Sequence, residues 1–359
     1  MDSPKLSNRS GKIGEMLRAE PVASIVMLAY NHGPYLAQAI ESILQQETDF
    51  AFELIVAEDC SKDNTRAIAL SYERANPEVV RVVTSKKNVG AHENLRRSEA
   101  LCRGRYIAYC EGDDYWNSKR KLQIQVEFLE AHSDYSMIHS DCRWHDLEFG
   151  RLVENAVSLR EGLNDMDAFN ELLSGRRIIW TVSVCVRRTI LQAVLRESPE
   201  CYDPRFLMGD TQRFLEIARR GKVKYQPEAL ATRQALLESA TRSKNAARVL
   251  RFAFSAKDVL DHYIDKYGCP DAVAKVAKRR STTHVLSCAF EAGDVQTAKA
   301  MIRECREHGI PVPLKGQLYA IGSRSTVLRA LCRPVLGILI LGQKVQRRLS
   351  RMLKSEGSV

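Results

Sequence analysis

The stretch Arg105–Trp116, RYIAYCEGDDYW, places Glu111, Asp113 and Asp114 directly after a short apolar run. The apolar run predicts a buried strand. Three carboxylates crowded at the end of a strand repel one another unless a cation neutralises them. Ligation by oxygen alone suits Mg²⁺ or Mn²⁺, and we therefore expect the three side chains to bind one of these ions.

The alternative for the same stretch is a plain turn that leads into a helix. Asn117 or Ser118 would cap that helix, and Leu122, Val126 and Leu129 recur at helical spacing to form its buried face. The helix is expected in either case, and its cap does not require three acids upstream. The metal site is therefore the favoured interpretation.

Towards the N-terminus, further apolar runs alternate with helical patterns. Strands are predicted at 22–28, 52–57 and 79–84, and helices at 35–46, 66–74 and 92–102. This alternation predicts an α/β fold, with a mainly parallel sheet and helices on both of its faces. In such sheets a ligand binds outside the carboxyl ends of the strands.

Two more polar loops lie at predicted strand ends. The loop AYNHG offers Tyr30 as a flat surface for a base and Asn31 as a turn former. The loop EDCSKDNT begins with Glu58 and Asp59, and a carboxylate there can accept a hydrogen bond from a base N–H. The alternative for this loop is that Asp63 or Asn64 caps the next helix. Base binding and helix capping can both occur in the same loop.

Together these loops resemble the family 2 glycosyltransferases of the GT-A fold, which bind a nucleotide-diphosphate sugar. The resemblance covers about residues 22–233, and four elements agree in order: a Y-N loop, an acidic pair with a G-S-x-D-x-T type loop, an N-x-G element and a D-x-D-D metal element. The matching positions are Tyr30, Asn31, Glu58, Asp59, Ser61, Asp63, Thr65, Asn88, Gly90, Asn94, Gly104, Glu111, Gly112, Asp113 and Asp114.

The resemblance implies a role for each part of the site. It implies donor binding by Tyr30, Asn31, Glu58, Asp59, Ser61, Asn88 and Glu111, and binding of Mn²⁺ or Mg²⁺ by Glu111, Asp113 and Asp114. The segment FLMGD matches the part of the family that carries the catalytic base, which makes Asp210 the candidate. The alternative role for Asp210 is to cap the helix that begins at Thr211.

The implied activity is an inverting, metal-dependent transfer from a nucleotide-diphosphate sugar, a UDP-sugar by default. The acceptor would be a hydroxyl-bearing glycan or lipid-linked molecule in surface polysaccharide or glycolipid synthesis. The segment around Trp180 and Thr181 matches the part of the family that lines the acceptor side.

Two departures favour the alternative of a catalytically weak or inactive sugar-nucleotide-binding relative. Glu111 stands where Asp is commoner, and Ala235 stands where the family often has a histidine. Arg233, Arg242 or Lys244 could bind the diphosphate in place of that histidine, and solvated surface is the alternative for each.

Composition and pattern divide the 359 residues into four parts. They are a polar leader at 1–20, the GT-A domain at 21–240, a helical domain at 241–310 and a basic, partly apolar segment at 311–359. Amphipathic patterns predict helices at 246–267, 271–289 and 295–308, with Gly293 and Asp294 as the turn before the last of these.

The ten cysteines are scattered with no C-x-x-C pair, which favours reduced thiols and a cytoplasmic protein. The N-terminal stretch has no apolar core of the signal-peptide kind.

The net charge of +10 is concentrated near the C-terminus. The sequence from Pro311 onward contains nine basic residues and a single acid, Glu356, which accounts for +8 of that charge. The excess positive charge therefore does not form a basic groove along the catalytic domain. We expect no nucleic-acid partner for this reason. A glycoside hydrolase, which needs two carboxylates across a cleft but no nucleotide site, is the other class we disfavour.

The basic excess borders the apolar run VLGILIL at 335–341, which is far shorter than the roughly 20 residues that cross a bilayer. This combination predicts docking of 325–354 on an anionic membrane surface, at the cytoplasmic face. An ordinary terminal helix packed on the helical domain is the alternative.

Overall fold

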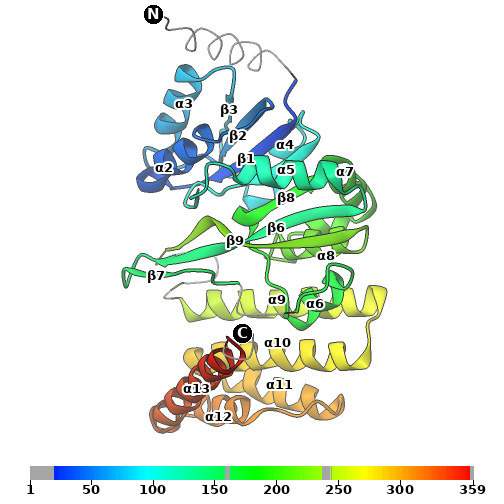
Figure 1. The fold of residues 1–359 in the computed structure, drawn as a ribbon. Helices are drawn as coiled ribbons and strands as arrows, with labels where there is room; N and C mark the ends of the chain where they lie inside the picture. Colours follow the sequence, from blue (N-terminus) through cyan, green and yellow to red (C-terminus); the bar gives the residue numbers. More distant parts are fainter. Residues whose placement is uncertain (1–19, 158–161, 237–242, 244, 356–359) are drawn as a thin grey trace, which may run out of the picture. The chain divides into compact units, whose positions relative to one another are not determined.

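The computed structural model describes residues 20–157, 162–236, 243 and 245–355, with side chains up to residue 340. Contacts divide the chain into two compact units, Met1–Leu237 and Glu238–Val359 (Figure 1). The second unit includes both the expected helical domain and the basic C-terminal segment. The expected leader lies outside the described residues except for Glu20, and Arg242 and Lys244 also lie outside them.

Among the described residues, nine strands form one sheet in the first unit. They are β1 (Ala23–Ala29), β2 (Phe52–Glu58), β3 (Val80–Val83), β4 (Tyr106–Tyr109), β5 (Tyr115–Trp116), β6 (Tyr135–Asp146), β7 (Arg151–Val153), β8 (Val184–Arg187) and β9 (Lys222–Ala235). The order is β3-β2-β1-β4-β8-β6-β9-β5, and β7 pairs with β6. Strands β1 to β4 are parallel, as predicted. Strands β5, β7 and β8 pair antiparallel with their neighbours, so the whole sheet is mixed.

Helices cover both faces of this sheet, as the alternating pattern predicted. They are α2 (Gly33–Leu44), α3 (Thr65–Ala75), α4 (Ala91–Glu99), α5 (Lys121–Ala131), α6 (Ala168–Ser174), α7 (Arg188–Glu197) and α8 (Thr211–Ala218), with short 3₁₀ helices η1 (Thr181–Ser183) and η2 (Pro199–Tyr202). Successive side chains of β1 point to opposite faces. Ile25 and Met27 pack in a cluster with α2 and α5, whereas Val26 belongs to a second cluster with α4, α7 and α8.

The helix after the acidic stretch begins later than its expected cap. Helix α5 starts at Lys121, with Arg120 at the N-cap position and no side-chain cap bond. The prediction of a cap at Asn117 or Ser118 was therefore wrong. Asn117 instead donates from Nδ2 to the Ala229 carbonyl at 2.7 Å, because this stretch is held against β9. The predicted buried face, formed by Leu122, Val126 and Leu129, is confirmed.

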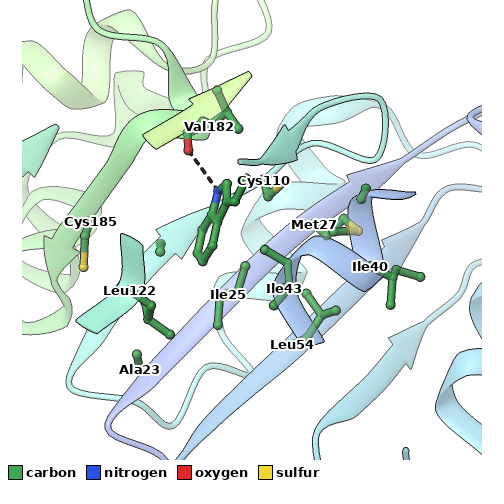
Figure 2. Close-up of a cluster of buried hydrophobic side chains, with 14 of the residues drawn as sticks. Ala23, Ile25, Met27, Ile40, Ile43, Leu54, Cys110, Leu122, Val182 and Cys185 are labelled. Atoms are coloured by element: carbon green, nitrogen blue, oxygen red, sulfur yellow. Dashed lines mark hydrogen bonds between the residues drawn. The ribbon is translucent and has the colours of Figure 1, made fainter. Parts of the chain in front are cut away.

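A buried cation lies in the core beside the acidic stretch. Trp116 donates from Nε1 to the Val182 carbonyl at 3.1 Å (Figure 2). The Lys121 Nζ lies 4.0 Å from the centroid of the Trp116 ring and donates to Gln125 Oε1 at 2.7 Å. Because burial disfavours the ammonium form, the pKa of Lys121 falls to about 8 from its ordinary 10.5.

We expect Lys121→Met to raise the free energy of unfolding at pH 7 by about 1–3 kcal/mol, since it removes a buried charge. Between pH 8 and 10.5 the unfolded wild type holds a proton on this amine that the folded protein has lost. The free energy of unfolding of the wild type should therefore rise with pH between 8 and 10.5, and that of the variant should lack this rise. Urea unfolding followed by tryptophan fluorescence measures this in the first unit, which contains all three tryptophans. The exposed Lys119→Met is the matched control, and equal pH profiles for wild type and Lys121→Met would contradict the prediction.

The second unit is helical. Its helices are α9 (Ala246–Tyr267), α10 (Asp271–Ala292), α11 (Val295–Glu307), α12 (Leu314–Gly322) and α13 (Thr326–Ser355) (Figure 1). The predicted turn is present: Gly293 ends α10 at a φ of 69°, and Asp294 caps α11 by accepting from Thr297 N at 3.0 Å. No helix within the described residues is both long and apolar enough to cross a membrane.

Candidate active site

The loops after β1 and β2 are joined by hydrogen bonds at the carboxyl edge of the sheet. Asn31, at a φ of 56°, makes the turn after β1, as its residue type predicted. Its N–H donates to Ser61 Oγ at 3.0 Å, and its Oδ1 accepts from Lys62 N at 2.9 Å. The Gly33 N–H donates to Asp63 Oδ2 at 2.9 Å. Tyr30, which precedes Asn31 in the first loop, is 39% exposed.

Glu58, the last residue of β2, is fully buried beside the second loop. Its Oε1 accepts from the Ser61 N–H at 2.5 Å, and its Oε2 accepts from Arg66 Nε at 2.6 Å. Burial acts to raise the pKa of Glu58, but the bonds from Ser61 and Arg66 outweigh burial and hold the pKa below its ordinary value. Glu58 is therefore a charged carboxylate that holds the loop in place through its bonds to Ser61 and Arg66.

Asp59 is also buried and binds the backbone of the loop between β3 and α4. Its two oxygens accept from the Val89 N–H at 2.8 Å and the Gly90 N–H at 2.9 Å. The Gly90 N–H also donates to Asn88 Oδ1 at 3.0 Å. In the second loop Asp63, rather than Asn64, makes the capping contact, accepting from Thr65 N at 3.0 Å. Helix capping in this loop is thus present alongside the expected donor-site residues.

The three carboxylates after β4 have different surroundings. Asp114 is buried, and its Oδ1 accepts from the Gln234 N–H of β9 at 2.7 Å. The Asp113 side chain is 20% exposed. Glu111 Oε2 is buried and has no hydrogen-bond partner. Burial, and then the charges of Asp113 and Asp210, raise the pKa of Glu111 to about 7.

Gly112 lets the first loop approach these carboxylates closely. Its N–H donates to the Leu28 carbonyl at 2.9 Å, and a Cβ at this position would lie only 2.9 Å from His32 Nδ1. His32 Nδ1 in turn lies 3.8 Å from Asp113 Oδ1 and has no hydrogen-bond partner. We did not expect His32 from the sequence. Its position directly after Asn31, in a loop at the ligand edge, was the available signal.

Asp210 caps α8 and also faces the segment that precedes β8. Its Oδ1 accepts from the Thr211 N–H at 2.7 Å, and its Oδ2 accepts from Thr181 Oγ1 at 3.2 Å. The helix cap is therefore present, and it engages one oxygen of the carboxylate. Thr181 lies just before β8, which runs antiparallel to β4, so Asp210 lies near the end of β4 that the three carboxylates follow.

A buried ionic network fixes the helix that carries Asp210. Arg213, in the first turn of α8, pairs with Glu99 of α4 and donates to Tyr109 Oη at 2.6 Å. Tyr202 donates from Oη to the other oxygen of Glu99 at 2.7 Å. Because these partners lie on α4, β4 and η2, the position of α8 is tied to the sheet.

Arg233 of β9 brings a positive charge to the same edge. Its guanidinium carbon lies 5.6 Å from the centroid of the Trp180 ring, and its charge acts on both Glu111 and Asp114. Ala235, where a histidine is common in the family that the sequence resembles, is buried at the end of β9. The structure thus supplies a cation two residues before the missing histidine.

The carboxylates after β4 provide part of a binding site for a hard divalent cation. Within the described ranges, no group of three or more His, Cys, Asp or Glu side chains forms a ready metal cage. The unpartnered, buried Glu111 Oε2 and the accessible Asp113 nevertheless offer two carboxylates. Mg²⁺ and Mn²⁺ sites that also bind a phosphate commonly use one or two protein carboxylates, and this donor set suits them.

Known proteins share both sequence and fold with this chain. Residues 24–192 match the family model of glycosyl transferase family 2. The uncharacterized protein Rv1520 of Mycobacterium tuberculosis is 38% identical over 111 residues, which cover 31% of this chain and 32% of that protein. A Bacillus subtilis protein named as a teichuronic acid biosynthesis glycosyltransferase, TuaG, is 30% identical over 45% of this chain and 62% of its own length. The chain thus matches less than two thirds of the length of these relatives.

Two solved structures have a similar fold. S. aureus TarS 1-349, solved with UDP-GlcNAc, superposes with a TM-score of 0.54 at 15% identity and covers 84% of this chain and 79% of its own. The mannosyltransferase PcManGT of Pyrobaculum calidifontis, solved with GDP-Man and Mn²⁺, gives 0.52 at 14% identity and covers 88% and 87%. At such low identity the likeness shows the fold alone, and it confirms the expected GT-A fold with a helical C-terminal region.

Proposed function

We propose that the chain, whose residues 24–192 match the family model of glycosyl transferase family 2, transfers a sugar from a nucleotide-diphosphate sugar to an acceptor hydroxyl. One observation carries the proposal: Glu111, Asp113 and Asp210 lie at the carboxyl end of β4, and Tyr30, which is 39% exposed, follows the parallel neighbour β1. The ligand-bound states of TarS and PcManGT support a nucleotide-sugar donor and a divalent metal.

For donor binding, we assign the base to the exposed ring of Tyr30. Asp59 and Asn88 hold the neighbouring loop through the Gly90 N–H, and Asn31, Glu58 and Ser61 hold the two loops beside the ring. This arrangement is built by internal bonds before any donor arrives. Loops that are already ordered lose less conformational entropy when the donor binds.

Glu111 and Asp113 are the proposed metal-binding carboxylates, and Asp114 supports them through its bond to β9. Mn²⁺ or Mg²⁺ bound there would neutralise charge on the diphosphate leaving group. Arg233, beside the same carboxylates, is placed to add positive charge on the diphosphate side.

The chemical step we propose is a single displacement with inversion. Asp210 takes the proton from the acceptor hydroxyl while its oxygen bonds to the anomeric carbon. The bond between that carbon and the diphosphate oxygen breaks, and the nucleoside diphosphate leaves with the electron pair. Thr181 and the Thr211 N–H orient the Asp210 carboxylate, and Arg213 fixes its helix.

The acceptor we propose is a hydroxyl-bearing glycan or a lipid-linked molecule, used in surface polysaccharide or glycolipid synthesis at the cytoplasmic face of a membrane. TuaG, named for teichuronic acid biosynthesis, supports this class of product.

A thermal-shift panel of UDP-, GDP- and dTDP-sugars, each with and without Mn²⁺, tests the donor assignment. A ligand that binds only the folded protein stabilises it by about 2.7 kcal/mol at a hundred times its Kd, so the true donor should raise Tm by several degrees. We expect one nucleotide class to stand out, and only with Mn²⁺. A flat panel would contradict the proposal. A shift without sugar transfer to any acceptor would identify the inactive, sugar-nucleotide-binding alternative.

A further inference from the structure

One face of α13 exposes a row of large apolar side chains. Val327, Leu331 and Ile338 are 70%, 66% and 71% exposed, and Val335 between them is 45% exposed. Successive members are four, four and three residues apart, which places them on one side of a helix. We call these four residues the α13 stripe.

The opposite side of α13 already packs within its own unit. Cys332 and Leu336, four residues apart, are buried in the core cluster that α10 and α12 share. Arg333 pairs with Glu291 of α10 at 2.9 Å. The helix is therefore held by one face, and the α13 stripe is not needed to attach it. A contiguous apolar row that the fold leaves open marks an interaction surface.

The sequence continues the same pattern to the end of the helix. Leu341, Val345, Leu349 and Met352 follow Ile338 at intervals of three or four residues. The residues between them carry basic charge: Lys344, Arg347, Arg348, Arg351 and Lys354. In the sequence, the apolar positions keep the spacing of the α13 stripe and the basic positions fall between them.

We propose that α13 lies in the plane of an anionic membrane surface, with the α13 stripe in the acyl boundary and the basic side chains against lipid headgroups. Charge complementarity selects this partner. A second copy of the chain would bring the same excess of nine basic residues against one acid, and the two would repel each other. An anionic bilayer attracts basic side chains and also accepts apolar ones. The inference does not depend on sugar transfer, and vesicle binding can therefore fail or succeed independently of donor binding.

Flotation of the full-length protein with vesicles tests this. We expect binding to vesicles of phosphatidylcholine with phosphatidylglycerol, and little binding to phosphatidylcholine alone. The variant Val327→Ser/Leu331→Ser/Ile338→Ser should reduce the partition coefficient by at least about tenfold, since three side chains lose their burial in lipid. Arg347→Gln/Arg348→Gln/Arg351→Gln should also weaken binding and reduce its sensitivity to salt.

The matched control is Leu314→Ser/Met166→Ser, which removes two other exposed apolar side chains and should leave partitioning unchanged. The stripe residues are exposed, so the serine variant should fold, and an unchanged circular dichroism spectrum checks this. Equal partitioning of wild type and the serine variant would overturn the proposal. A wild-type dimer that the serine variant converts to a monomer, with no vesicle binding by either, would also overturn it in favour of self-association.

Discussion

Asp210→Asn should lower kcat by about 10²–10⁴-fold while leaving the donor-induced rise in Tm intact, because a positioned general base contributes that much to a proton transfer. The amide cannot take the acceptor proton. Its single oxygen can still accept from the Thr211 N–H, while its NH₂ group replaces the oxygen that accepts from Thr181 Oγ1 and can donate to that hydroxyl instead. Asn and Asp are about equally good N-caps, so α8 should remain folded. Initial-rate kinetics on the donor and acceptor found by the panel, together with thermal shift, measure both quantities.

The matched control for Asp210→Asn is Asp203→Asn. Asp203 lies just upstream, and its oxygens accept from Arg205 rather than from groups at the site. We expect near-wild-type kcat for this control. Near-wild-type transfer by Asp210→Asn with intact donor binding would remove Asp210 from the role of base.

Glu111→Gln should abolish the metal-dependent part of donor binding and lower kcat/KM by about 100-fold or more, since a metal at a diphosphate is worth several kcal/mol. The ligand-free variant should nevertheless be as stable as the wild type or more so. Glu111 is buried against the like charges of Asp113 and Asp210, and glutamine removes one of these charges. Loss of function with unchanged or higher Tm separates a metal-binding role from a structural one.

Chelation should reproduce the Glu111→Gln phenotype in the wild type, and added Mn²⁺ should reverse it. Glu93→Gln is the control, because Glu93 is a partly exposed acid of α4 that pairs with Arg96. A Glu111→Gln protein that keeps its Mn²⁺-dependent thermal shift would contradict the metal assignment, as would transfer that is indifferent to chelator.

Much of the fold followed from the sequence because its signals are local. The β-branched runs and helical spacings predicted β1 to β4 and their helices to within a few residues. Helix α9 begins and ends at the predicted residues, Ala246 and Tyr267. The antiparallel pairing of the later strands was not predicted, since partners far apart in the sequence leave no local pattern.

For the candidate site as well, the sequence predicted the features that depend on neighbouring residues but not the contacts between distant ones. Acidic residues directly after a strand predict a ligand edge, but not what each side chain contacts. The sequence could not show that Asp114 bonds to Gln234, or that both oxygens of Asp59 bind the N–H groups of Val89 and Gly90. Likewise, His32 reaches Asp113 only because Gly112 has no side chain to keep the loops apart. Such contacts depend on tertiary packing.

The bond from the Gln234 N–H to Asp114 also bears on the order in which the protein assembles. The two residues are 120 positions apart, and among the described strands β5 pairs with β9 alone. Pairings this distant form late in folding, because the intervening chain must first be ordered. During synthesis the acidic stretch therefore leaves the ribosome long before its partner strand is made. A chain released at residue 192, where the family match ends, would contain the acids but neither β9 nor Asp210.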